Sequence, residues 1–193
     1  MKKKILIIIP VRLGSKRLKY KNILEIKGLP MFVLVAKEAL KSKYNPTLYV
    51  STESRKIINL CKRYKLNFIK RPQKLAFDNV EKQLVIVDAV KKLKSKEKPE
   101  IIISLQANTP QFNVTDLDKA IIFFERKVFP NSPIRELITI DDNNLQDGAF
   151  RIMTLNTVFQ KTLSTKVGVY RTNYLDVHYY KEFKIVKKKI EKS

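Results

Sequence analysis

The sequence predicts an α/β fold built on a parallel sheet, and three observations lead to this prediction. Short apolar runs with the length of buried strands alternate with segments whose apolar residues recur at helical spacing. The first run, Ile5 to Ile9, ends at Pro10 and continues directly into a basic loop that contains a glycine. With 193 residues, 44% of them hydrophobic, the chain can bury one substantial core, so a single domain over residues 1–193 is expected.

The first half of the chain contains three further elements in order. Pro30 starts a helix that runs to about Ser42, and Asn45-Pro46 ends it. Residues 47–51 are expected to form the second strand, and Thr52 is expected to cap the next helix. Its apolar face consists of Ile57, Leu60, Cys61 and Tyr64. Cys61 is therefore expected to be a packed core thiol.

The middle of the chain repeats the alternation. Residues 66–70 form a short strand and a loop follows to Asp78, which with Glu81 suggests a capping box. The helix after it carries Val80, Leu84, Val87 and Val90. Residues 101–105 form another buried strand. Thr115 and Asp118 are then expected to cap a helix whose inward residues are Leu117, Ala120, Ile121 and Phe124.

The last third of the chain has a looser pattern. Short strands are expected near 134–140, 150–154 and 167–171, and residues 181–191 form a closing helix. The inward face of that helix consists of Phe183, Val186 and Ile190.

Composition limits the environment and the partners. No apolar run has the length of a membrane span, and a single cysteine excludes an intramolecular disulfide, so a cytoplasmic protein without membrane contact is expected. The net charge of +22 would attract polyanions, which keeps a nucleic-acid-binding module as an alternative. The lysines are nevertheless spread along the chain, and the densest cluster, residues 187–189, lies on the closing helix, which argues against nucleic acid.

The loop after the first strand is the strongest candidate for a binding site. Its cations are Arg12, Lys16, Arg17, Lys19 and Lys21. Ligands usually bind at the carboxyl ends of strands in α/β sheets, and Gly14 lets the backbone approach a ligand closely. Exposed amides and cations suit a polyphosphate. The spacing matches neither the P-loop pattern nor G-x-G-x-x-G, so those two devices are excluded.

The same loop, P-V-R-L-G-S-K-R-L-x-x-K-N-I, resembles the opening signature of the cytidylyltransferases that activate sialic acids and related 3-deoxy-2-keto sugar acids, P-A-R-x-G-S-K-x-x-x-x-K-N. A lysine-rich solvated loop is the alternative. The resemblance implies a Rossmann-like three-layer α/β/α nucleotidyltransferase domain with a mostly parallel twisted sheet. It implies catalytic roles for Arg12, Lys16 and Lys21. The nucleotide-binding residues implied in this loop are Val11, Arg12, Gly14, Ser15, Lys16, Lys21 and Asn22.

Further blocks of the same family follow in the same order. Residues 50–54 resemble V-S-T-D-S, although they could simply cap a helix. Residues 71–78 resemble R-P-x-x-L-A-x-D, which implies that Arg71 and Asp78 lie at the nucleotide, with the arginine also within reach of the sugar. Residues 105–110 resemble L-Q-x-T-S-P, which implies that Gln106 and Thr109 bind the sugar acid.

Two departures concern the metal. A related branch that acts on 3-deoxy-manno-octulosonate has a magnesium-binding aspartate where this chain has Asn108, which favours the sialate-like branch. Residues 175–183 resemble I-D-I-D-x-x-x-D-F, whose first two aspartates hold Mg²⁺; Asp176 is kept and His178 replaces the second. Imidazole is a poor ligand for Mg²⁺. The triphosphate could supply more of the coordination, another metal could bind, activity could be weak, or His178 could be structural.

A segment that borders the family's sugar pocket, N-G-A-[IF]-Y, is matched by Asp147, Gly148 and Ala149, followed by Phe150, which implies that the first three bind the sugar acid. The resemblance thus covers residues 3 to about 186 and implies that CTP and a 2-keto-3-deoxy sugar acid condense, with Mg²⁺, to a CMP-sugar and pyrophosphate. The alternatives are another sugar or an alcohol phosphate as substrate, or a degenerate nucleotide-binding homologue. Residues 127–144 look compressed where relatives carry a dimerisation segment, so a homodimer remains open.

Overall fold

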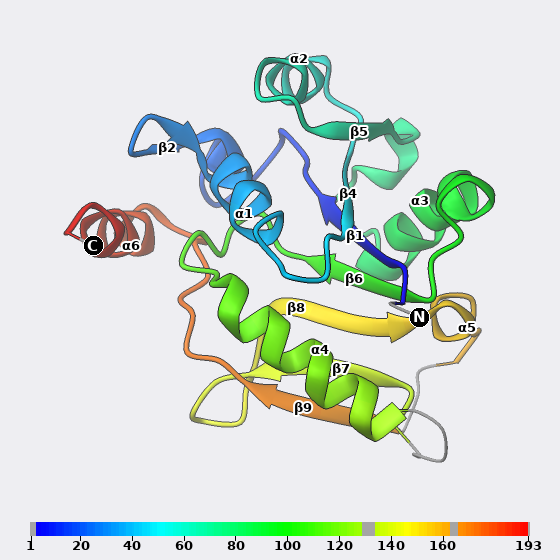
Figure 1. Cartoon of the computed structure of the whole chain (residues 1–193). Coiled ribbons are helices and arrows are strands. Elements are labelled where there is room, and N and C mark those ends of the chain that lie inside the picture. Colours follow the sequence, from blue (N-terminus) through cyan, green and yellow to red (C-terminus); the bar gives the residue numbers. More distant parts are fainter. Residues whose placement is uncertain (1–2, 129–133, 163–165, 193) are drawn as a thin grey trace.

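Seven strands form one twisted sheet in the computed structural model, which describes residues 3–128, 134–162 and 166–192 (Figure 1). The strands are β1 (Ile5–Pro10), β4 (Thr47–Thr52), β5 (Asn67–Lys70), β6 (Ile101–Leu105), β7 (Glu136–Ile140), β8 (Gln146–Thr154) and β9 (Val167–Arg171). Their order is β5-β4-β1-β6-β8-β7-β9. The pairs β5–β4, β4–β1, β1–β6 and β7–β9 are parallel, whereas β8 is antiparallel to both its neighbours. The mostly parallel sheet is therefore confirmed.

Helices cover both faces of the sheet and give three layers, as expected. They are α1 (Met31–Ala39), α2 (Arg55–Arg63), α3 (Lys82–Glu97), α4 (Val114–Val128), α5 (Leu155–Val158) and α6 (Tyr180–Lys192). Ile5, Ile7 and Ile9 of β1 pack in the apolar cluster that includes α1, α2 and α4. Leu6 and Ile8 point the other way, into the cluster that includes α3 and α5. This alternation follows from the two-residue period of a strand and buries β1 on both faces.

A small accessory unit lies beside the sheet. The hairpin of β2 (Glu25–Ile26) and β3 (Leu29–Pro30) packs against α6, which Figure 1 shows at the left of the view. Ile26, Phe183 and Val186 are buried in this contact. Two short 3-10 helices complete the chain, η1 (Lys21–Ile23) and η2 (Gln73–Leu75). The packing of α6 on the hairpin brings the segment before α6 next to the basic loop.

Two predicted helix starts are wrong. The side chain of Ser54, not of Thr52, accepts a hydrogen bond from the backbone of α2, because Thr52 still belongs to β4. Asp78 caps no helix, since α3 begins only at Lys82 and Asp78 pairs with cations of the basic loop. The predicted apolar face of α3 is also wrong in part, because Leu84 is 51% exposed. The buried residues of this helix are Val85, Ile86, Ala89, Val90 and Leu93.

In the second half of the chain, the predicted inward residues of α4 agree with the structure, whereas predicted ends of helices and strands differ from it. All four residues predicted to face inward on α4 are buried, but α4 starts at Val114, so Thr115 lies inside it. The side chain of Asn113 accepts a hydrogen bond from the backbone of Thr115, and the Asp118 carboxylate accepts one from the hydroxyl of Ser42. Strand β8 begins at Gln146, four residues before the predicted start. Of the predicted compressed region 127–144, residues 129–133 lie outside the described part.

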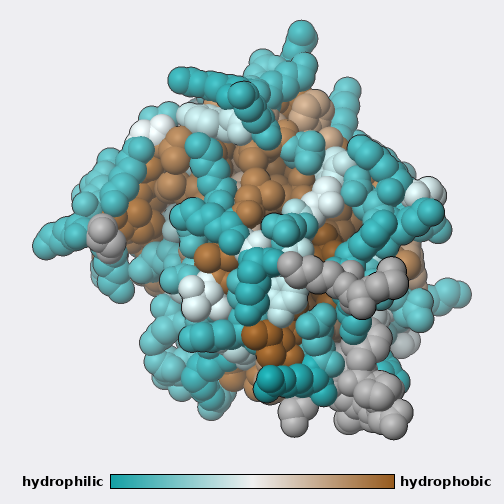
Figure 2. All heavy atoms as spheres, in the orientation of Figure 1, coloured by the Kyte–Doolittle hydropathy of each residue, from teal (hydrophilic) through white to brown (hydrophobic). Residues whose placement is uncertain are grey.

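The surface and the core have the expected polarity. On the face in Figure 2, hydrophilic side chains project around most of the molecule, and hydrophobic residues lie mainly between and beneath them. Within the described ranges, no helix is long and apolar enough to cross a membrane. Cys61 is buried, and burial raises the pKa of its thiol to about 12, which confirms a packed core thiol.

Candidate active site

The basic loop forms a cationic cavity of about 370 Å³, the phosphate cavity, at the carboxyl end of β1. Its lining consists of Arg12, Ser15, Lys16, Arg17, Lys21, Asp78 and His178. The Asp78 carboxylate pairs with the Arg12 guanidinium and lies 3.2 Å from the Lys16 ammonium. The hydrogen bonds from Arg12 and then from Lys16 hold the pKa of Asp78 below its ordinary value. Asp78 therefore occupies two of the cations that a phosphate would need.

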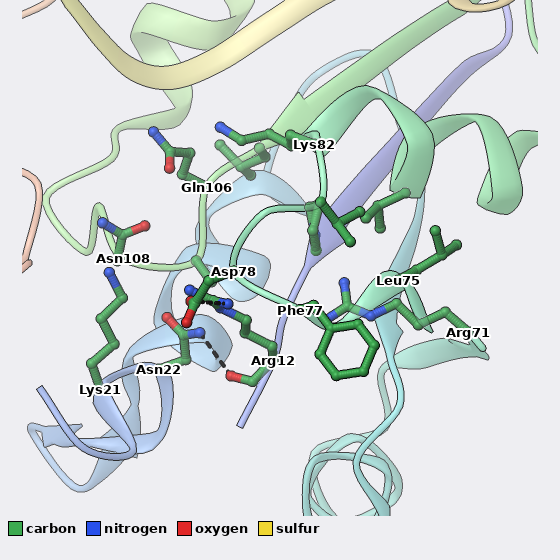
Figure 3. Close-up of a pocket in the computed structure, with 15 residues that line it drawn as sticks. Arg12, Lys21, Asn22, Arg71, Leu75, Phe77, Asp78, Lys82, Gln106 and Asn108 are labelled. Atoms are coloured by element: carbon green, nitrogen blue, oxygen red, sulfur yellow. Dashed lines mark hydrogen bonds and ion pairs between the residues drawn. The ribbon is translucent and has the colours of Figure 1, made fainter. Parts of the chain in front are cut away.

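A second cavity of about 230 Å³, the nucleoside cavity, adjoins the first and shares Arg12, Lys21 and Asp78 with it. Figure 3 shows its side chains converging from the basic loop, the loop before α3 and the end of β6. The Asn22 side chain donates a 3.0 Å hydrogen bond to the carbonyl of Arg12, while its buried Oδ1 has no partner within the described structure. A buried acceptor without a partner is costly, so Asn22 is suited to receive a hydrogen bond from a ligand.

Lys21 reaches from η1 to the segment before α6. Its ammonium donates a 3.1 Å hydrogen bond to the carbonyl of Val177, and the Asn108 amide donates to the same oxygen at 3.2 Å. Figure 3 shows Lys21 directed toward Asn108 across the cavity. Burial lowers the pKa of Lys21, and the nearby Asp176 opposes that shift. These contacts tie the segment 176–178 to the basic loop although about 155 residues of chain separate them.

Asp176 contacts two residues that follow the end of β6. Its carboxylate accepts hydrogen bonds from the Thr109 hydroxyl and, at 3.2 Å, from the Gln106 amide. Burial raises the pKa of Asp176, and the hydrogen bond from Thr109 partly offsets that effect. The structure therefore joins three residues that the sequence placed in one site from two distant blocks.

His178 lies beside Asp176, and its imidazole also contacts the guanidinium of Arg17. Its Nε2 is 3.7 Å from the Asp176 carboxylate, and its Nδ1 is 3.4 Å from a guanidinium nitrogen of Arg17. Burial, and then the charge of Lys21, lower the pKa of His178, which favours the neutral imidazole. Within the described residues, no three His, Cys, Asp or Glu side chains gather into a possible metal centre. For Mg²⁺ the donor set is thus one carboxylate, which suits a site completed by phosphate oxygens of a substrate.

A buried ion pair forms the wall of the nucleoside cavity near β4 and β5. Arg71 is 4% exposed, and its Nε and Nη2 lie 2.9 and 2.6 Å from one oxygen of Glu53. The other carboxylate oxygen accepts a 3.4 Å hydrogen bond from the backbone of Leu13. Glu53 therefore links the R-P-x-x-L-A-x-D loop to the basic loop and fixes the Arg71 guanidinium at the cavity.

The predicted sugar segment lies at the start of β8. Gly148 adopts φ +67°, and a Cβ there would lie 3.3 Å from Cδ of Gln106 and closer still to its amide nitrogen. Asp147 binds the hydroxyl of Thr172 and the backbone of Ala149 through its carboxylate, so its side chain supports the turn. Ala149 is buried, and its carbonyl accepts a 2.9 Å hydrogen bond from the backbone of Gln106. These residues position Gln106.

Three residues of the basic loop have different environments. Val11 is fully buried and its backbone amide donates to the carbonyl of Ser51, so its side chain belongs to the core. Ser15 lines the phosphate cavity. Gly14 is exposed, and a Cβ added to it would have no described protein atom within 4 Å, so only a ligand could require a glycine there.

Sequence comparison places this arrangement in a known family. The family model described as cytidylyltransferase matches residues 6–182. The chain belongs to the cytidylyltransferase family.

Individual relatives agree with that family. The chain is 36% identical over 78 residues to an N-acylneuraminate cytidylyltransferase of Escherichia coli O18:K1:H7, an alignment covering 40% of this chain and 19% of the relative. It is 31% identical over 118 residues to a pseudaminic acid cytidylyltransferase of Campylobacter jejuni, covering 60% of this chain and 50% of that protein. The chain thus spans about half or less of these relatives' length.

A solved structure shows the same fold. CMP:2-keto-3-deoxy-manno-octonic acid synthetase complexed with CTP superposes with a TM-score of 0.80, covering 98% of this chain and 99% of the other. The sequence identity is 14%, so this likeness concerns the fold. It confirms the Rossmann-like architecture expected for the family.

Two residues of the site are missed by sequence reasoning. Lys82 lies in the nucleoside cavity, and Figure 3 shows its side chain directed toward Gln106. Lys82 is exposed as a residue, yet desolvation lowers the pKa of its ammonium, and Asp176 opposes that shift. In the sequence, Glu53 stands out only as part of a segment that could cap a helix or match the family. Its place in the V-S-T-E-S block could have identified it as a site residue, whereas nothing in the sequence distinguishes Lys82 from the many other lysines.

Proposed function

We propose that this member of the family is a nucleotidyltransferase that condenses CTP with a 2-keto-3-deoxy sugar acid to give a CMP-sugar and pyrophosphate. The observation that carries the proposal is the convergence, at the carboxyl ends of β1 and β6, of a cationic phosphate cavity with the Asp176–Gln106–Thr109 cluster. The family match supports the substrate class, as do the relatives that are named N-acylneuraminate, pseudaminic acid and 3-deoxy-manno-octulosonate cytidylyltransferases.

The basic loop would bind the triphosphate. During attack of the sugar hydroxyl on the α-phosphorus, negative charge grows on the departing pyrophosphate. Arg12 and Lys16 would neutralise that charge, after the phosphates displace Asp78 from them. Lys21 is anchored to the Val177 carbonyl and would hold the phosphates nearest the nucleoside.

The nucleoside would occupy the cavity between Asn22 and Arg71. The free Oδ1 of Asn22 can accept a hydrogen bond from the nucleoside. Arg71, fixed by Glu53, can donate to the carbonyl or ring nitrogen of a pyrimidine. A guanidinium locked by a buried partner loses little side-chain freedom when a ligand binds, which favours tight binding.

The acceptor would bind on the other side of the same site. Gln106 and Thr109 are oriented by Asp176, and Gly148 keeps room for the Gln106 side chain. With Asp176 ionised, the carboxylate can accept the hydrogen bond of the sugar hydroxyl and direct it toward the α-phosphate. We further propose Mg²⁺ as cofactor, with Asp176 holding it together with substrate phosphates, where it would neutralise phosphate charge. His178 would be at most a weak ligand.

The test is pyrophosphate release by purified protein with Mg²⁺ and CTP against neuraminic, legionaminic, pseudaminic and 3-deoxy-octulosonic acids. Release with one acid, and with CTP in preference to ATP, GTP and UTP, is the expected result. Arg12→Ala and Lys16→Ala should each lower turnover by about a hundredfold or more, because each removes a charge that stabilises the transition state. Lys91→Ala, an exposed lysine of α3 that lines none of the cavities, serves as the control.

Other outcomes identify the alternatives. Turnover of another sugar or of an alcohol phosphate would replace the acceptor in this proposal, and preference for another nucleoside triphosphate would replace the nucleotide. Binding of CTP without turnover of any acceptor would indicate a degenerate homologue. Failure to bind CTP, or near-normal activity of Arg12→Ala, would contradict the proposed roles.

A further inference from the structure

A third cavity of about 160 Å³ lies beside the nucleoside cavity, between α3 and the strands β6 and β8. Its polar lining consists of Lys82, Gln83, Ser104, Gln146 and Arg151. Lys82 lines both cavities, so they meet at this side chain. The third cavity therefore adjoins the site at Lys82, and it has no described lining residue in common with the phosphate cavity.

A second contact joins the third cavity to the reacting groups. Gly148 lines the third cavity, Gln106 lines the nucleoside cavity, and the two are packed so closely that a Cβ on Gly148 would not fit. The amide of Gln106 also donates to Asp176. An acceptor that binds beside Gln106 would therefore reach the third cavity at Lys82, the side chain that lines both cavities.

Two cations line this cavity, and they differ in whether their charge is paired with another side chain. The Arg151 guanidinium is fixed by the carboxylate of Glu136 and by the Gln83 side chain, to which Nη1 donates at 2.8 Å. Glu136 is buried and offsets the charge of Arg151. Lys82, in contrast, makes no hydrogen bond or ion pair with another described residue at the site. Arg151 and Asp176 are both near enough to act on the Lys82 ammonium electrostatically.

The third cavity therefore has an excess of positive charge and, among the described residues, an unpaired ammonium at its entrance. A carboxylate placed between Lys82 and Arg151 would form an ion pair with the Lys82 ammonium and accept hydrogen bonds from the Arg151 guanidinium. Such charge-assisted hydrogen bonds are stronger than those between neutral groups. The amides of Gln83 and Gln146 and the hydroxyl of Ser104 can donate to and accept from sugar hydroxyls. A neutral sugar would leave the Lys82 ammonium desolvated and unpaired.

We propose that the third cavity binds the acceptor sugar and that Lys82, supported by Arg151, holds its carboxylate and selects acids over neutral sugars. This inference rests on the proposed function, because it assigns the acceptor half of the same site. Lys82 is the specificity-determining residue, and Arg151 is held in place by Glu136 to complete the carboxylate site.

The test compares each acid with its methyl ester, which removes the negative charge and adds one methyl group. KM values are measured by pyrophosphate release for N-acetylneuraminic acid, 3-deoxy-manno-octulosonic acid, both esters and CTP. Lys82→Met should raise KM for the acid about tenfold or more and leave KM for its ester within about twofold. Lys82→Arg should restore most of the preference, and Lys91→Met, from an exposed position on the same helix, should change nothing.

A second variant guards against misfolding. Arg151→Lys keeps a charge opposite Glu136 and should lower the preference for acid over ester by a smaller factor. Direct titration of acid and ester by calorimetry supplies a readout that needs no turnover. Loss of acid binding in Lys82→Met by a protein without turnover would support this inference while the proposed function fails. Turnover with an unchanged ratio of acid to ester in Lys82→Met, or no acid binding by the wild type, would overturn the inference.

Discussion

Gly148→Ala tests how the site depends on one close contact. Gly148 has φ +67°, which costs a residue with a Cβ about 1–2 kcal/mol. The added methyl would also overlap the Gln106 amide, so Gln106 must turn away and lose its 3.2 Å hydrogen bond to Asp176, a further loss of about 1 kcal/mol. We expect the free energy of unfolding to fall by about 2–3 kcal/mol and KM for the acceptor to rise about tenfold.

Gly28→Ala is the matched control for this prediction. Gly28 has nearly the same backbone conformation, φ +72°, in the turn of the β2–β3 hairpin, but no described atom lies within 4 Å of an added Cβ. Urea unfolding of this variant should show the backbone cost alone, about 1–2 kcal/mol, with acceptor KM unchanged. If both variants lose the same stability and both keep the wild-type KM, the argument that Gly148 positions Gln106 is refuted.

Three further predictions concern other parts of the molecule. Cys61, with a pKa of about 12, should remain unmodified by iodoacetamide at pH 8 and react only in urea; rapid labelling of the native protein would contradict its burial. Arg71→Met leaves the buried Glu53 charge unpaired and should lower the free energy of unfolding by about 3–5 kcal/mol, whereas Arg71→Met with Glu53→Leu should recover part of that loss in the same urea titration. Asp78→Asn frees Arg12 and Lys16 and should bind inorganic pyrophosphate more tightly at pH 7. Because the pKa of Asp78 is held below its ordinary value, this advantage should persist through the ordinary titration range of a carboxyl group and be lost only at lower pH, where Asp78 becomes protonated. Weaker binding by the variant would show that Asp78 orients the cations.

Most of the fold could be predicted from the sequence because its signals are local. The run Ile5–Pro10 is apolar at every position before the proline, which is typical of a strand covered on both faces. The inward face of α4 follows directly from helical spacing. The ends are harder, since Thr52 and Ser54 are equally good caps in sequence and only the length of β4 decides between them.

The face of α3 could not be predicted for a related reason. Valines and leucines occur all around this helix, so periodicity could not separate Val85 and Ile86, which are buried, from Leu84, which is exposed. The antiparallel placement of β8 between β6 and β7 also has no local signal. Strand order is decided by which apolar faces can be buried together, and that is a property of the whole sheet.

The α/β class, the buried strands and the motif blocks follow from the amino-acid sequence, because apolar period and residue spacing are local properties of the chain. The meeting of Lys21, Gln106 and Asp176 follows from the folded chain alone, since parallel strands bring their loops to one edge of the sheet. It also decided that Asp78 pairs with Arg12 and that the Lys82 ammonium lies near Arg151 and Asp176. Charge pairing and desolvation depend on distance in space, which spacing along the chain does not contain.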